Sequence, residues 1–145
     1  MEKLNFSTTI NATPERIWEV LWGDKTYGQW TSVFSEGSRA ETDWKLGSKI
    51  YFLDGKGNGM VSQVAEIRPN EYMSIHHLGM VKDGIEDLTS AEVKKWEGAH
   101  ENYSLTKSGT GTMLDVDMDS VEEFSDYFRK TWPTAMDKLK EISES

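Results

Sequence analysis

Three histidines and one glutamate are the side chains in this sequence best suited to chemistry at a site. His76 and His77 are adjacent in a stretch typical of a β-strand, and His100 directly precedes Glu101. Neighbouring residues of a strand point to opposite faces of a sheet, so His76 and His77 cannot bind one metal ion from there.

His77 alternates with Met73 and Ile75, so we expect it to face inward. Three interpretations stay open. It can be a core histidine hydrogen-bonded to a neighbour, a polar group inside a cavity, or part of a metal site with Glu101. Because the metal interpretation has the least support, we predict no metal site.

Glu101 alternates with Tyr103 and Leu105, and both an inward and an outward orientation are open. An inward carboxylate would need a partner, for which His77 and Arg39 are the candidates. A carboxylate beside a histidine suits general acid–base chemistry. We find no second acid and no nucleophile. The glycine-rich segment 54–59 is followed by a predicted strand rather than by the helix that a phosphate loop requires. We therefore assign no catalytic residue and no cofactor.

The element that must position these residues is a long amphipathic segment from Val121 to Ile142. Its apolar residues recur every three or four positions, which predicts one α-helix with a broad aromatic stripe. Ser120 is a candidate N-cap with Glu123 at the capping-box position. Pro133 predicts a kink or the start of a second helix.

Most of the chain before this helix alternates apolar and polar residues. We predict a first strand near residues 4–10, short helices from Pro14 and over 24–29, a short strand near 38–42, and further strands over 49–53, 60–67, 72–78, 99–107 and 112–118. The segment Gly79–Gly98 is the one long interruption, with a short helix near 89–96. Hairpin-length connections favour an antiparallel sheet, so the predicted fold class is α+β, with six to seven strands curved around the C-terminal helix.

A curved sheet rarely closes completely on one helix, so we expect a cavity between them. Apolar and aromatic residues dominate the set that we predict to line it. The predicted ligand-binding residues are Trp30, Phe52, Met73, Ile75, His77, Trp96, Glu101, Tyr103, Phe128, Trp132 and Met136. We expect Trp96, on the long interruption, to act as a lid. Ordinary core packing is the alternative for many of these residues.

Composition excludes several classes of protein. The 145 residues have a net charge of −9 and contain no cysteine, which argues against nucleic acid and anionic membranes as partners and excludes disulfides and thiolate sites. No segment approaches the ~20 apolar residues of a membrane span. The N-terminus lacks the apolar core of a signal peptide, so we expect one cytoplasmic domain over residues 1–145.

Four phrases resemble the START-like helix-grip superfamily, and within it the small bacterial proteins homologous to the activator of Hsp90 ATPase. They are INATPERIWEVLWGDKTYGQW, LGSKIYF, GMVSQVAEIRPNEYMSI and FRKTWPTAMDKLKEI. The resemblance covers nearly the whole chain, but it departs from the usual Gly-Gly at Gly47-Ser48 and in the length of segment 79–98. The superfamily includes lipid carriers, hormone receptors, cyclases and ring-hydroxylating enzymes, so the resemblance indicates fold more than function.

Three functions therefore stay open. The leading hypothesis is a domain that binds a small apolar or amphipathic molecule. The resemblance also implies a module that contacts a chaperone, although the full cochaperone has two domains and this chain begins at its first predicted strand. The third is an enzyme on a hydrophobic substrate that uses His77, Glu101 or Tyr103.

Overall fold

One eight-stranded antiparallel sheet dominates the computed structural model, which describes residues 1–145. The strands are β1 (Glu2–Ile10), β2 (Arg39–Glu41), β3 (Lys49–Leu53), β4 (Gly59–Arg68), β5 (Tyr72–Lys82), β6 (Ile85–Asp87), β7 (His100–Ser108) and β8 (Gly111–Ser120). Their order is β1-β8-β7-β5-β4-β3-β2, and β6 pairs with the end of β5. The α+β helix-grip fold predicted from the sequence is confirmed.

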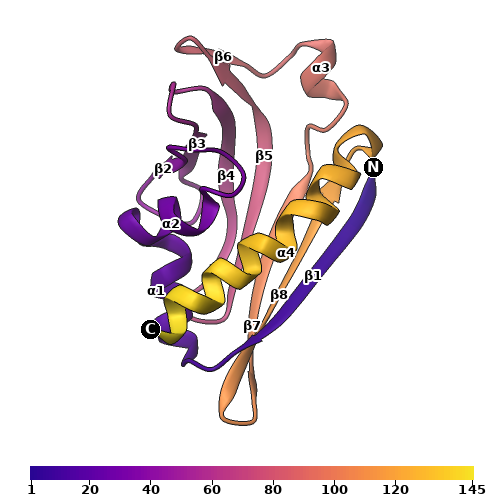
Figure 1. Ribbon diagram of the computed structural model, residues 1–145. Helices are drawn as coiled ribbons and strands as arrows, with labels where there is room; N and C mark the ends of the chain where they lie inside the picture. Colours follow the sequence, from indigo (N-terminus) through magenta and orange to yellow (C-terminus); the bar gives the residue numbers. More distant parts are fainter.

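Four helices complete the chain: α1 (Pro14–Trp22), α2 (Asp24–Thr31), α3 (Ala91–Lys94) and α4 (Glu122–Glu144). Thr13 caps α1 as its sequence indicates, because its hydroxyl accepts the N–H of Arg16 at 3.1 Å. In Figure 1 the yellow α4 crosses in front of the sheet diagonally, from the start of β1 to the side of α1. No helix combines the length and apolar character needed to cross a membrane.

The two ends of α4 are packed differently. Its C-terminal half buries Ala135, Met136 and Leu139 in the main core, and it packs against β1, α1 and α2. Its N-terminal half carries Phe124 and Tyr127, whose exposed fractions are 42% and 44%. The aromatic stripe is therefore continuous in sequence, but only its second half is covered by the core.

Trp132 marks the point where α4 leaves the core. Its ring is 3% exposed and stacks on Phe6 at 5.8 Å between ring centroids. The rings of Trp30, Phe34 and Tyr103 surround it at 5.9, 5.1 and 6.1 Å. This cluster joins the sheet, α2 and α4, and such offset and edge-on aromatic contacts contribute about 0.5–1.5 kcal/mol each beyond burial.

One expectation about local structure was wrong, and one of the two alternatives at Pro133 is excluded. Ser120 does not cap α4, because it ends β8 and its hydroxyl donates to the carbonyl of Val121, which occupies the cap position without a side-chain bond. Pro133 starts no second helix, since α4 continues through it. Pro133 is exposed.

The segment Gly79–Gly98 is also more ordered than expected. β5 continues to Lys82 and turns back into β6 through Asp83 and Gly84, both of which have positive φ angles, 51° and 78°. Two successive residues in this region form the tight turn that favours hairpins, for which Asp-Gly is a typical sequence. The short helix expected near residues 89–96 is α3, and Ser90 caps it by accepting the N–H of Val93.

Candidate functional site

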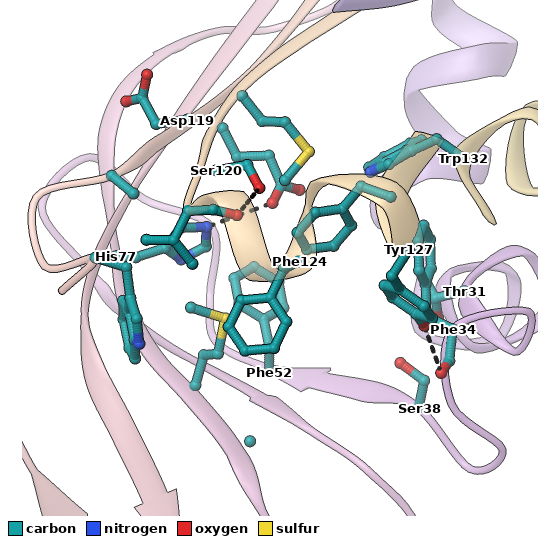
Figure 2. A pocket seen from close by; sticks show the side chains of 18 of the residues that line it. Thr31, Phe34, Ser38, Phe52, His77, Asp119, Ser120, Phe124, Tyr127 and Trp132 are labelled. Atoms are coloured by element: carbon teal, nitrogen blue, oxygen red, sulfur yellow. Dashed lines mark hydrogen bonds and ion pairs between the residues drawn. The ribbon is translucent and has the colours of Figure 1, made fainter. Parts of the chain in front are cut away.

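A cavity of about 450 Å³ lies between the sheet and the N-terminal half of α4. The cavity has 23 lining residues, and fifteen of them are hydrophobic. The lining as a whole comes from β3, β4, β5, β7, β8, α2, α3, α4 and the connections between them. In Figure 2 the rings of Phe52, Phe124 and Trp132 lie around the interior, with His77 on the opposite side from Trp132. The cavity lies beneath the part of α4 that precedes Trp132, which contributes no fully buried residue to the main core.

Polar contacts on both sides of α4 hold its N-terminal half in place over the cavity. Towards β1 and β8, Arg129 pairs with Glu2 at 3.1 Å and the Ser125 hydroxyl donates to that of Ser120 at 3.1 Å. Towards α2, the Tyr127 hydroxyl donates to the carbonyl of Phe34 at 3.1 Å, a bond drawn in Figure 2. These contacts fix the wall of the cavity without filling it.

A chain of hydrogen bonds crosses the otherwise apolar floor. The Ser62 hydroxyl lies 2.7 Å from Nδ1 of His77, and Nε2 of His77 lies 3.4 Å from Oε1 of Glu101. The Tyr103 hydroxyl donates to Oε2 of the same carboxylate. Because a carboxylate only accepts, the His77 proton belongs on Nε2, and Ser62 then donates to Nδ1.

Burial controls the ionisation of the phenols around this chain. Removal from water raises the pKa of Tyr103 well above its ordinary value, and the neighbouring Glu101 carboxylate raises it further. Burial likewise raises the pKa of Tyr27. Both phenols therefore stay protonated while the protein is folded, and Tyr103 acts as a donor to Glu101.

This arrangement suits recognition better than proton transfer by histidine. Ser62 is fully buried and does not line the cavity, so it cannot reach a bound molecule. Both ring nitrogens of His77 have partners inside the protein. A general base must reach the substrate proton within hydrogen-bonding distance. Within this chain of hydrogen bonds, Glu101 lines the cavity and each of its oxygens has a further lone pair.

The structure brings together eight of the eleven residues predicted to bind a ligand. Trp30, Phe52, His77, Trp96, Glu101, Tyr103, Phe128 and Trp132 all line the cavity. Met73, Ile75 and Met136 do not, because they are fully or almost fully buried in the core. Glu101 points inward, with His77 rather than Arg39 as its partner, since Arg39 bonds to Glu41 and to the carbonyl of Asp54.

The eleven predicted residues do not include Met60 and Met80, which pair with each other across β4 and β5 and line the cavity. Strict alternation places Met80 on the face opposite His77. A β-bulge between Val61 and Ser62 leaves one extra residue in β5, Leu78, and this restores Met80 to the concave face. The sequence around Leu78 gives no indication of this bulge, so it could not predict that Met80 faces the cavity.

His76 and His100 form a separate pair on the other face of the sheet. Their rings are parallel, with 4.8 Å between centroids. No group of three or more histidine, aspartate or glutamate side chains is arranged to hold a metal ion.

Comparison with known proteins places these features in a family. The sequence profile of the family described as "Activator of Hsp90 ATPase homolog 1-like protein" matches residues 11–144. A comparison with curated proteins found no match.

Solved structures share the fold at low sequence identity. The chain is similar to the Aha1 dimer from Colwellia psychrerythraea, with a TM-score of 0.74 at 19% identity over 99% of this chain and 97% of that one. Protein MLL2253 from Mesorhizobium loti gives 0.74 at 15% identity, over 97% and 96% of the two chains. CalU16 from Micromonospora echinospora gives 0.67 at 15% identity, over 97% and 75%.

Proposed function

The chain belongs to the activator of Hsp90 ATPase homolog 1-like family, and from this premise we propose that it is a non-enzymatic domain that binds a small apolar or amphipathic molecule. The observation that carries the proposal is the cavity of about 450 Å³ whose lining is mostly hydrophobic. Pockets of this size and character are typical of small-molecule sites. The proposal treats residues 1–145 as one binding unit, located in the cytoplasm.

The shape of the cavity supports a guest rather than a packing defect. Side chains from the sheet, α2 and α4 line a mostly apolar space that is large enough for a small molecule. Arg129 ties α4 to Glu2 of β1, and Tyr127 ties it to the carbonyl of Phe34 after α2. Three flexible methionines, Met60, Met80 and Met118, give the lining an adaptable surface.

The test is a panel of neutral apolar probes followed by NMR. Binding in the cavity shifts the signals of Tyr103, Phe128 and Trp132 together, because these rings line it from β7 and from α4. If a broad hydrophobic panel leaves all three unmoved, the proposal fails.

A cavity-filling variant sharpens this test. Met80→Trp adds bulk inside the cavity, and overpacking of this kind is expected to weaken probe binding about tenfold or more. Met113→Trp is the matched control, because Met113 does not line the cavity and belongs to the opposite face of β8. Equal affinities for the two variants would contradict binding at this site.

The family description favours a second candidate, a module that contacts a chaperone. Phe124 and Tyr127 would be the natural contact residues, because they are large, apolar and about two-fifths exposed on α4. Stimulation of Hsp90 ATPase activity by the purified protein tests this candidate, and Phe124→Ala is expected to reduce any stimulation. Absence of both stimulation and binding removes it.

A further inference from the structure

The charges around the cavity are all negative. Its lining includes three carboxylates, Glu92, Glu101 and Asp119, and no lysine or arginine. Two of these lie outside the interior. Glu92 pairs with Lys95 at 3.5 Å on the exposed α3, and both of these side chains are about half exposed.

Asp119 is likewise satisfied elsewhere. It pairs with Lys3 at 3.6 Å and accepts the N–H of His100 at 2.9 Å. In Figure 2 its carboxylate lies apart from the rings that surround the interior. Glu101 is therefore the carboxylate that a bound molecule would meet.

Glu101 has two hydrogen-bond partners, and no lysine or arginine pairs with it. Its partners are the His77 ring and the Tyr103 hydroxyl, one to each oxygen. The side chain is only 20% exposed, and each carboxylate oxygen has a further lone pair free to accept. A carboxylate withdrawn from water is stabilised by a positive charge or by additional donors. The protein supplies no lysine or arginine for this purpose in the lining.

The rings beside Glu101 also favour a cation. Phe52 lies edge-on to the His77 ring at 6.4 Å, and Trp30 lies edge-on to Tyr103 at 6.5 Å. Phe52 and Trp30 both line the cavity, so an ammonium group bound at Glu101 would share it with aromatic rings, whose faces attract positive charge. An anionic head group would instead be placed against the carboxylate.

We propose that the cavity selects apolar or aromatic molecules that carry a protonated amine, with the ammonium group on Glu101 and the apolar body against the aromatic walls. This rests on the proposed ligand-binding function and narrows it to one chemical class. Amines are preferred over neutral analogues, and carboxylates are excluded.

Three probes with one bicyclic skeleton test this preference: 2-naphthylmethylamine, 2-naphthylmethanol and 2-naphthoate. Calorimetric titration is performed at a pH of about 8.5, where an ordinary imidazole is neutral and an alkylamine is protonated. A charge-assisted hydrogen bond predicts that the amine binds about tenfold or more tightly than the alcohol, with the carboxylate weakest.

Variants then assign the preference to one residue. Glu101→Gln keeps the size of the side chain and should bring the amine and the alcohol to similar affinities. Glu141→Gln is the matched control, because it removes the same charge from an exposed position on α4 that does not line the cavity. It should leave the amine-to-alcohol ratio unchanged.

The outcomes separate the two proposals. If the alcohol binds as tightly as the amine to the unmodified protein, the charge selection is overturned while ligand binding stands. If none of the three probes binds, the charge selection is overturned, and the broad hydrophobic panel decides the ligand-binding proposal. If the preference survives in Glu101→Gln, its assignment to Glu101 is wrong. The comparison on the unmodified protein holds even if the Glu101 variant fails to fold.

Discussion

The Ser62 hydroxyl lies 2.7 Å from Nδ1 of His77, and both side chains are buried between β4 and β5. This bond fixes the ring so that its other nitrogen faces Glu101 at 3.4 Å. Ser62 does not line the cavity, but it holds the His77 ring, while the Glu101 carboxylate, which can only accept, sets the proton on Nε2.

Removal of this bond should destabilise the protein. Ser62→Ala leaves a buried acceptor on His77 unpaired, which predicts a loss of about 1–3 kcal/mol in the free energy of unfolding by urea denaturation. His77→Phe in the Ser62→Ala background should cost less than the two single changes added together, since no ring nitrogen is left without a partner. Strict additivity would show that the two side chains are not coupled.

The stability of the protein should fall as the pH drops below about 6.5 because of His76. Burial, and the nearby charges of His100 and His77, lower the pKa of His76. The unfolded chain therefore takes up a proton at a higher pH than the folded protein, so stability is lost as the pH falls through the ordinary histidine range.

Urea unfolding between about pH 7.5 and 5.5 measures this loss, and His76→Gln should reduce it. Glu141→Gln serves as the control and should keep the original slope. If the free energy of unfolding falls with pH equally in the unmodified protein and in His76→Gln, the loss of stability does not come from His76.

Two of the five tyrosines should resist ionisation at high pH. Burial raises the pKa values of Tyr27 and Tyr103, so the tyrosinate absorbance of these two residues should appear only when the protein unfolds. Since the unfolded phenols ionise near pH 10, their contribution to stability is present below about pH 10 and lost above it. The double variant Tyr27→Phe/Tyr103→Phe should lose this delayed step and keep the early one. A single smooth titration of all five phenols in the folded protein would contradict the burial of these two.

Replacement of Pro133 should stabilise α4. Proline cannot donate to the carbonyl of Arg129, and yet the helix continues through it at an exposed position. Pro133→Ala restores that donor and should raise the free energy of unfolding by about 1–3 kcal/mol. Thr134→Ala, the exposed neighbour, should change it by less than about 0.5 kcal/mol. If Pro133→Ala leaves the free energy of unfolding unchanged or lowers it, proline geometry is required at this position.

The architecture could be predicted from the sequence because its signals are local. The spacing of Trp132, Leu139 and their neighbours identifies the long helix, and the Thr13-Pro14 pair marks the start of α1. The Asp83-Gly84 hairpin was also a local signal, but the long polar segment around it obscured it. Ser120 fits the capping pattern, but pairing with Glu2 keeps it in β8.

The membership of the site depended on tertiary structure. Met73 and Ile75 share a strand face with His77, but the core covers them completely, and of the three only His77 lines the cavity. The alternation of apolar and polar residues cannot show which part of the strand is covered by the core. The bulge at Leu78, which brings Met80 to the cavity, is set by the pairing of β4 with β5 and not by either strand alone.

The central claim is that the space beneath the N-terminal half of α4 admits a guest. Intermolecular NOEs between 2-naphthylmethanol and the methionine methyl groups test it most directly, because the seven methionines sample different parts of the molecule. NOEs to Met60, Met80 and Met118 are expected, and none to Met113 or Met73. NOEs to Met113, or none to the three cavity methionines from a bound probe, would contradict it.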